Sequence, residues 1–118
     1  MNQKEIEEYL SSFQGSESSF PFGPEALVYK VMGKMFALVS QCEEVARVTL
    51  KCNPEDGAML VGQYESVVPG YYMNKKHWVT ISLTNELSTE MLSDLAKESY
   101  KLVVSKLTKK DKTTLQDL

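Results

Sequence analysis

The chain has 118 residues, of which 42% are hydrophobic and 25% are charged, and its formal net charge at pH 7 is −3. This length supports one hydrophobic core and excludes two ordinary domains. The negative net charge argues against strong nonspecific binding to nucleic acid, because such binding usually requires a basic domain. The longest apolar run is much shorter than the roughly 20 residues that span a bilayer, and the polar start of the chain lacks a signal-peptide core. We therefore expect a cytoplasmic protein without a membrane segment.

The first predicted element is an amphipathic helix over residues 3–13. Its apolar side chains recur at the spacing of one helix face, and they are Ile6, Tyr9, Leu10 and Phe13. The stretches 15–19 and 21–24 follow, and their Gly, Ser and Pro residues are typical of turns. We expect a loop across both stretches.

Alternating apolar and polar residues then predict three strands. Residues 25–41 alternate on either side of Gly33-Lys34, so we expect a hairpin whose turn lies at these two residues. Residues 46–52 form the third predicted strand. It places Val48 and Leu50 on one face and Lys51 on the other.

The second half of the chain alternates between helices and strands. Asn53-Pro54 is a strong helix start, which predicts a helix over residues 54–63. Pro69-Gly70 predicts a reversal of the chain, followed by strands at 71–74 and 78–83 with a turn at Lys75-Lys76. Ser88 is the expected cap of a last helix over residues 88–107. We interpret residues 1–108 as a single domain and residues 109–118 as a polar, frayed tail.

This order, α-β-β-β-α-β-β-α, predicts an α+β fold of two layers, in which an antiparallel sheet carries its helices on one face. The most apolar side of each strand is assigned to the helices, so the remaining side faces solvent. The side chains expected on this uncovered face are Lys30, Arg47, Thr49, Lys51, Trp78, Thr80 and Ser82. The uncovered face would be basic and would carry the only tryptophan of the chain.

Four segments in the same order resemble the MmcQ/YjbR family of small bacterial proteins. They are residues 20–24 (FPFGP), 29–38 (YKVMGKMFAL), 67–78 (VVPGYYMNKKHW) and 99–107 (SYKLVVSKL). The resemblance spans nearly the whole chain and implies the YjbR-like, or CyaY-like, fold of order α-β(3)-α-β(2)-α. The family is commonly labelled DNA-binding and has no established catalytic residues. This chain has Val79 where relatives usually have an asparagine.

The first functional hypothesis is a surface that contacts DNA or another nucleic acid. Lysines would neutralise phosphates, and an aromatic ring would stack on an exposed base. The candidate residues are Lys30, Lys34, Arg47, Lys51, Tyr72, Lys75, Lys76, His77 and Trp78. The alternative interpretation is that the lysines only solvate the open face and its turn, while Trp78 seals an edge of the core.

The second hypothesis is a protein-interaction module or a homodimer that uses the uncovered sheet face. It rests on Met32, Phe36, Leu38 and Trp78, which we expect on that face, because exposed apolar area is often covered by a partner. The alternative is that these side chains fill local gaps within the sheet.

We expect no enzymatic activity, no metal and no cofactor. The chain has two cysteines and one histidine, fewer ligands than a structural zinc site usually requires. His77 is the only candidate for a general base near neutral pH. Cys52 is expected to face the core, and Cys42 precedes two glutamates that would raise its pKa.

Overall fold

The computed structural model describes residues 1–42, 45–70 and 74–118. Six antiparallel strands form one sheet in the order β1-β2-β3-β4-β6-β5. The strands are β1 (Ser16–Ser19), β2 (Ala26–Val31), β3 (Lys34–Cys42), β4 (Val45–Lys51), β5 (Val67–Pro69) and β6 (Trp78–Ser82). The helices are α1 (Gln3–Ser11), α2 (Pro54–Gln63), α3 (Thr89–Ser105) and α4 (Lys109–Gln116).

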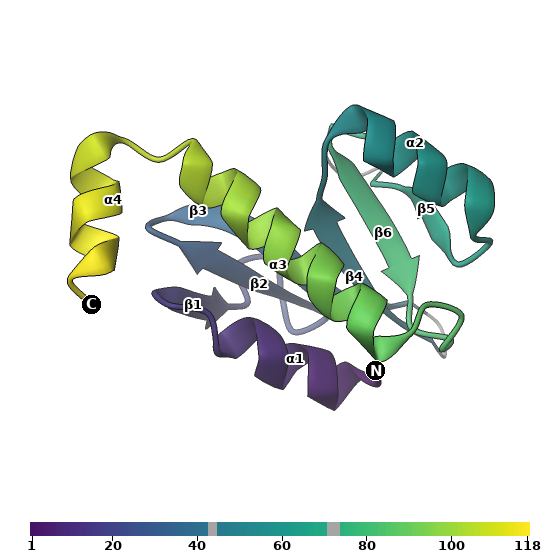
Figure 1. Ribbon diagram of the computed structural model, residues 1–118. Helices are drawn as coiled ribbons and strands as arrows, with labels where there is room; N and C mark the ends of the chain where they lie inside the picture. Colours follow the sequence, from purple (N-terminus) through teal and green to yellow (C-terminus); the bar gives the residue numbers. More distant parts are fainter. Residues whose placement is uncertain (43–44, 71–73) are drawn as a thin grey trace.

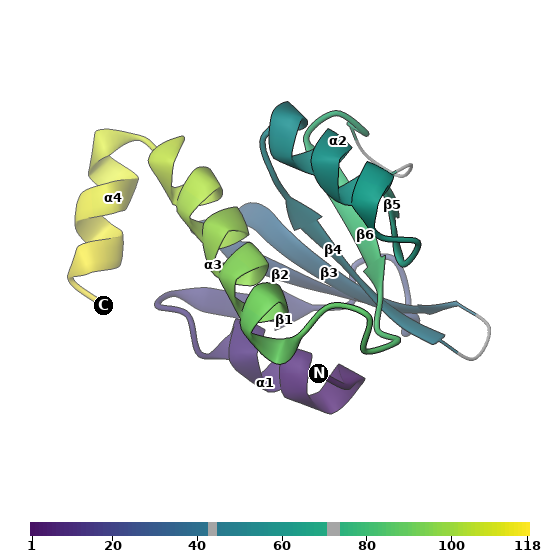
Figure 2. The ribbon, with the colours of Figure 1, turned by 45° about the vertical axis from the view of Figure 1, so that its right-hand side comes forward.

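The helices α1, α2 and α3 lie on one face of the sheet (Figure 1). Helix α3 crosses the middle of the sheet, α1 lies beside it near β1, and α2 lies over β5 and β6 (Figure 2). Between the two layers, side chains such as Tyr29, Leu50, Ile81 and Leu92 are almost completely buried. The predicted α+β architecture, with the helices on one face of an antiparallel sheet, is confirmed.

Short-range signals explain where the three long helices begin. The side chains of Asn2, Asn53 and Ser88 each accept a hydrogen bond from a backbone amide in the first turn of the helix that follows. Such caps satisfy amides that have no partner within the helix. The predicted helix over 54–63 matches α2 at both ends, and the other two predictions differ from α1 and α3 by one or two residues.

A β-bulge in β3 moves Phe36 to the helix-covered face. Tyr29 pairs with Ala37 and Lys30 pairs with Met35, so Phe36 has no partner on β2. In such a bulge the extra residue does not alternate with its neighbours. The Phe36 ring is 0% exposed and lies 5.3 Å from the ring of Tyr100, centroid to centroid. The prediction that Phe36 lies on the uncovered face is therefore wrong.

The segment predicted as a loop at 15–19 contains strand β1. Its four residues are polar, yet they pair with β2 from Ser16↔Val31 to Ser19↔Val28. The backbone of β2 offers unpaired amides and carbonyls along this edge, and their hydrogen bonds do not depend on apolar side chains. The sheet consequently contains a strand at this edge that the sequence pattern does not predict.

The segment predicted as a frayed tail contains helix α4. The Thr108 side chain accepts from the Asp111 amide at the helix start, and Leu115 is only 5% exposed. The Gln14 side chain donates to the Leu115 carbonyl over 2.8 Å. This helix is therefore held by its cap and by contacts with the turn that precedes β1.

Candidate nucleic-acid interface

The sheet face opposite the helices carries three parallel rows of side chains, which follow from the strand register. The middle row runs across five strands through Val28, Leu38, Thr49, Thr80 and Val68. Its members Val28, Thr49 and Thr80 are 1%, 2% and 5% exposed, and the two threonine hydroxyls hydrogen-bond over 2.9 Å. This uncovered face thus has a closely packed centre although no helix lies on it.

The two outer rows of the uncovered face are more polar. One contains Arg47, which pairs with Ser40 and Ser82 on the neighbouring strands. The other contains Lys30 on β2 and the cross-strand pair of Lys51 and Trp78. The register therefore agrees with the side chains predicted for this face, with Trp78 and Lys51 as direct neighbours.

The chain does not reverse at Pro69-Gly70 as predicted. Pro69 pairs with Val79 as the last residue of β5, and the Gly70 amide donates to the Trp78 carbonyl over 2.8 Å. Proline is tolerated here because β5 is an edge strand. The strand predicted at 71–74 falls largely on residues 71–73, outside the described part of the chain. The predicted turn at Lys75-Lys76 is confirmed, since the His77 amide donates to the Asn74 carbonyl over 2.9 Å.

This turn and three other segments surround a pocket of about 410 Å³, which we call the Trp78 pocket. Its lining residues come from the end of β4, the start of α2, the turn before β6 and the last turns of α3. Its lining residues are Lys51, Cys52, Asn53, Pro54, Asn74, His77, Trp78, Leu102 and Lys106. The Lys51 ammonium lies 5.9 Å from the centroid of the Trp78 ring, which is partly exposed. The pocket therefore combines an accessible ring with cations from two elements.

The structure brings together some of the predicted site residues and separates others. Lys51, His77 and Trp78 line the Trp78 pocket, and Lys75 and Lys76 line a neighbouring depression beside α2. The remaining candidates lie elsewhere. Lys30 lies on β2, three strand spacings or about 14 Å from Trp78. Arg47 lies about 13 Å from Lys51 along β4, and Lys34 is exposed at the first position of β3. Tyr72 lies outside the described residues.

Sequence reasoning missed Lys106 as a member of the site. It follows the last residue of α3 and lines the Trp78 pocket together with Leu102. Helical spacing between Leu102 and Lys106 places both on one side of α3, but nothing in the sequence indicates that this side reaches the end of β4. The site is consequently more basic than the hairpin alone suggests.

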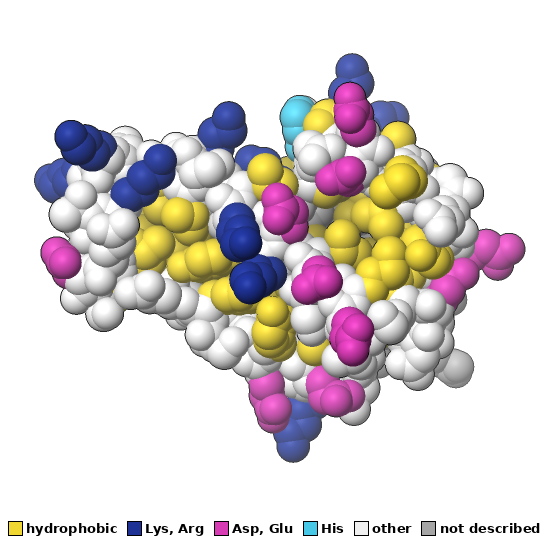
Figure 3. All heavy atoms as spheres, viewed as in Figure 1, with side chains coloured by type: hydrophobic (Ala, Val, Ile, Leu, Met, Phe, Trp, Pro, Cys, Tyr) yellow, Lys and Arg dark blue, Asp and Glu magenta, His cyan; other side chains and the backbone are white. Residues whose placement is uncertain are grey.

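Charged side chains are unevenly distributed over the helix-covered side of the molecule. Lysine side chains gather over α4 and the later turns of α3, whereas acidic side chains gather over α1 and the start of α3 (Figure 3). Glu55 and Asp56 in the first turn of α2 are the acids closest in sequence to the pocket residues Asn53 and Pro54. A net negative protein therefore presents a locally basic region, which attracts anions over about one Debye length.

The Trp78 pocket also brings Cys52 and His77 together. The Cys52 amide donates to the His77 carbonyl over 2.8 Å. Burial, and to a smaller extent the charge of Asp56, raise the pKa of the Cys52 thiol above its ordinary value. Because the thiolate is the nucleophilic form, this environment suppresses rather than promotes nucleophilic chemistry at Cys52.

Within residues 1–42, 45–70 and 74–118, no three His, Cys, Asp or Glu side chains are grouped so that they could hold a metal ion. In the same ranges, no helix has both the length and the apolar character needed to cross a membrane.

Comparison with known proteins identifies relatives along the whole chain. The YjbR family model matches residues 11–102. The chain is 42% identical to the uncharacterised protein YbdF of Escherichia coli O157:H7 over 95 residues, which cover 80% of this chain and 78% of that protein. It is 30% identical to the uncharacterised protein YjbR of Escherichia coli K12 over the full length of both proteins.

Solved structures of other proteins have a similar fold. The crystal structure of Deinococcus radiodurans protein DR2400, domain DUF419, superimposes with a TM-score of 0.87 at 35% identity and covers 98% of this chain and 88% of that one. A protein from Pseudomonas syringae shares the fold with a TM-score of 0.76 at 24% identity, covering 86% of this chain and 98% of its own. On the family model and on the identity to YbdF and YjbR, the chain belongs to the YjbR family.

Proposed function

We propose that the protein binds nucleic acid at the Trp78 pocket, with an unpaired base on the Trp78 ring and phosphates at the surrounding lysines. The observation that carries this proposal is that Lys51, His77, Lys106 and the partly exposed Trp78 line one pocket, in which the Lys51 ammonium lies 5.9 Å from the centroid of the Trp78 ring. Aromatic side chains hold bases of any sequence by stacking, while lysines neutralise the backbone. A single-stranded ligand is favoured because a base in a duplex presents only its edge.

We propose further that the protein binds its ligand without catalysing a reaction. We also propose that it acts in the cytoplasm. The raised pKa of the Cys52 thiol supports a binding role, because the one cysteine among the lining residues of the pocket is not activated as a nucleophile. The neighbouring Lys75 and Lys76 are exposed and extend the basic region beyond the pocket. They are available to phosphates without any rearrangement of the core.

The test is the salt dependence of binding to a fluorescently labelled oligothymidylate, measured by fluorescence anisotropy. Lys75→Glu together with Lys76→Glu should weaken binding and lower the slope of log K against log salt by about 1.4, since each single-strand phosphate contact contributes about 0.7. The matched control is Lys4→Glu together with Lys97→Glu, which changes the net charge equally at exposed positions on α1 and α3. Equal affinity of the wild type and the Lys75/Lys76 variant would contradict the proposal.

The only tryptophan supplies an independent readout. Stacking of a base on Trp78 should quench its fluorescence in proportion to the bound fraction. Quenching that saturates with the same affinity as the anisotropy signal supports contact at the pocket. Binding without any change in tryptophan emission would place the ligand elsewhere.

A second candidate function is association through the uncovered sheet face. The apolar members of its middle row support it, since Leu38 is partly exposed and Val68 is 37% exposed on a face without helices. Such surfaces often bind a second protein or a second copy. Light scattering is the direct test of the homodimer. A measured mass of 13.3 kDa would contradict the homodimer hypothesis, and twice that mass would support it.

A further inference from the structure

The uncovered face of the sheet carries the only arginine of the chain, Arg47 on β4. The strand register places Ser40 of β3 on one side of Arg47 and Ser82 of β6 on the other. Residues that lie directly opposite each other on neighbouring strands have Cβ atoms about 4.5–5.5 Å apart, so the arginine has a hydroxyl on each side. We call these three residues the Arg47 site.

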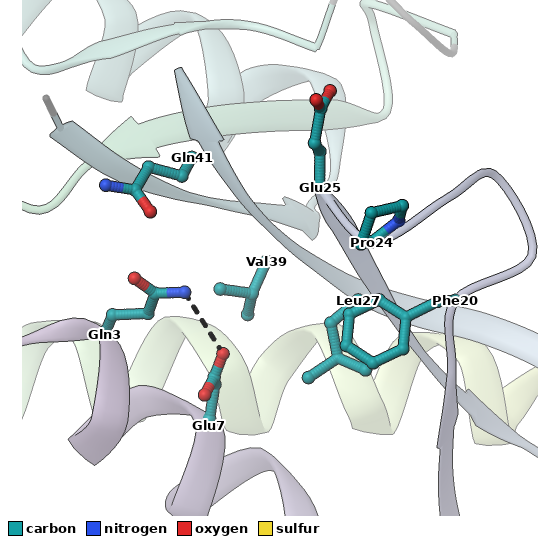
Figure 4. A pocket seen from close by; sticks show the side chains of 8 residues that line it. All are labelled: Gln3, Glu7, Phe20, Pro24, Glu25, Leu27, Val39 and Gln41. Carbon is teal, nitrogen blue, oxygen red and sulfur yellow. Dashed lines mark hydrogen bonds between the residues drawn. The ribbon is translucent and has the colours of Figure 1, made fainter. Parts of the chain in front are cut away.

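The three side chains of the Arg47 site share one face. Figure 4 shows the other side of β3, where Val39 and Gln41 line a pocket beside α1. Because successive side chains of a strand alternate between the two faces, Ser40 lies on the uncovered face. Ser40 and Ser82 are partly exposed, so a ligand on this face can reach both hydroxyls.

The Nε atom of Arg47 indicates that this site accepts a ligand. It is buried and has no hydrogen-bond partner among the described residues, although Arg47 as a whole is partly exposed. A buried N–H group without an acceptor costs free energy, so such groups usually bond to protein, water or an ion. Since Nε and a terminal nitrogen of a guanidinium donate in parallel, the matching acceptor has two or more oxygens.

The carboxylate at the end of the same row of side chains belongs to Glu86, and it has donors of its own. The Ser66 hydroxyl and amide donate to it over 2.6 Å and 2.8 Å. Ser66 lies beside Ser82, whose amide donates to the Ser66 carbonyl over 2.8 Å. It is therefore two strand spacings, or about 10 Å, from Arg47. Glu86 consequently does not supply the acceptor that the Arg47 Nε atom lacks.

We propose that the Arg47 site binds a phosphate group. The guanidinium fork holds two phosphate oxygens with Nε as one donor, and the serine hydroxyls donate to the remaining oxygens. A carboxylate has only two oxygens and would leave the hydroxyls without an acceptor. Because no helix covers this face, the arginine side chain can turn its Nε edge outward without any change in the core. The site lies about 13 Å from Lys51 along β4, and it does not depend on nucleic-acid binding at the Trp78 pocket.

The proposal is tested by NMR titration of the 15N-labelled full chain with inorganic phosphate, which replaces chloride at constant ionic strength. A chain with one arginine gives one side-chain Nε–H signal, so this signal reports Arg47 alone. It should shift and saturate with the same affinity as the backbone amides of Ser40 and Ser82. Acetate should bind at least several-fold more weakly. Absence of saturation, or equal binding of acetate, would overturn the proposal.

Tryptophan emission separates this site from the Trp78 pocket. Phosphate bound at Arg47 should leave the emission unchanged, because the two sites lie far apart on the face. Quenching of Trp78 with the same affinity as the shift of the Nε–H signal would place the phosphate at the Trp78 pocket, and the proposal would then be wrong.

Variants separate a built site from the general charge of the face. Arg47→Lys keeps the charge but removes the fork, and it should weaken phosphate binding at least tenfold, as read from the Ser40 and Ser82 amides. Ser40→Ala and Ser82→Ala should each weaken it several-fold. Lys30→Gln is the control, because Lys30 is a cation of the same face two strands away, and the affinity should change less than twofold. Unchanged affinity in Arg47→Lys, or equal weakening by Lys30→Gln, would contradict the proposal. Spectra of the free variants show whether each is folded.

Two sources of the phosphate group are distinguished by further probes. Methyl phosphate represents a phosphate monoester on a small molecule, and dimethyl phosphate represents the diester of a nucleic-acid backbone. Both should shift the Arg47 Nε–H signal, and the tighter of the two identifies the source. If neither compound shifts this signal, the site does not bind phosphate groups.

Discussion

The Ser99 hydroxyl donates a hydrogen bond to the Phe36 carbonyl over 2.6 Å, and it thereby joins α3 to the bulged part of β3. The same oxygen accepts from the Lys51 amide over 2.8 Å. The regular pairing of β3 with β4 ends at Ala37↔Leu50, so both backbone groups would otherwise lack a partner. A single serine therefore bridges the two strands where the bulge opens them.

Ser99→Ala should destabilise the protein by about 1–3 kcal/mol, because it leaves a buried carbonyl and a partly buried amide without their partner. The measurement is urea unfolding followed by circular dichroism. Ser105→Ala is the control on the same helix, since Ser105 is exposed and its hydroxyl donates to the Leu102 carbonyl of that helix. Its effect should stay within about 0.5 kcal/mol. Equal effects of the two substitutions would show that the bridge contributes little.

Gly70→Ala should distort the hairpin that positions Trp78. A Cβ atom at Gly70 would lie 2.7 Å from the Trp78 Cβ and 3.1 Å from its carbonyl carbon, and neither atom belongs to a flexible side-chain end. We expect a lower melting temperature and a shift of the tryptophan emission maximum. The control is Gly62→Ala in α2, where a Cβ meets nothing within 4 Å and helix propensity favours alanine by up to about 1 kcal/mol. An unchanged emission spectrum in Gly70→Ala would contradict this packing.

Leu115→Ala should release α4 from the body of the protein. Leu115 is the buried residue of this helix, and the loss of a buried leucine side chain costs about 2 kcal/mol or more. The measurement is limited trypsinolysis, which should cut at Lys109, Lys110 or Lys112 faster in the variant. Leu118→Ala removes the same atoms at a position that is 69% exposed, and cleavage should then proceed at the wild-type rate. Protection that survives Leu115→Ala would show that the cap and Gln14 hold the helix alone.

The contact between Ser66 and Glu86 makes a pH-dependent contribution to stability. The Ser66 hydroxyl and amide donate to the Glu86 carboxylate over 2.6 Å and 2.8 Å, and these bonds lower the pKa of Glu86 below 4.5. A lowered pKa stabilises the fold above the ordinary pKa, and this contribution is lost as the pH falls through the folded-state value. Glu86→Gln should therefore be less stable than the wild type at pH 7, and the difference should shrink as the pH falls through the lowered pKa of Glu86.

Thermal unfolding across this pH range measures the effect. The control is Glu98→Gln on α3, which removes the same charge from an exposed side chain. It should not reproduce the convergence of wild type and variant at low pH. A constant difference for Glu86→Gln at all pH values would exclude the charged hydrogen bond as its cause.

Elements with local signals could be predicted from the sequence, and those that depend on distant contacts could not. Asn53 and Pro54 specify the start of α2 by their own chemistry, so its position was predictable. Strand β1 has no apolar alternation and exists because β2 lies beside it. Helix α4 depends on contacts between Leu115 and the turn near Gly15, which is about a hundred residues away in the chain.

The same distinction holds for the candidate site. Trp78 and Lys51 were correctly placed on one face because strand alternation predicts a face without knowledge of the register. Phe36 was assigned to the wrong face because a bulge interrupts this alternation. No residue type in this part of the sequence indicates the bulge. Lys106 was missed because its position depends on the angle at which α3 crosses the sheet, a property of packing rather than of local sequence.

The two outermost strands limit how this protein can associate with others. At one margin β1 is four residues long and carries Glu17, and at the other β5 is three residues long and ends in Pro69. Short, charged or proline-terminated margins offer a poor template for a strand from another molecule. Partners should therefore meet this protein through side chains on its broad surfaces, and growth by main-chain pairing into ribbons or fibrils should be disfavoured.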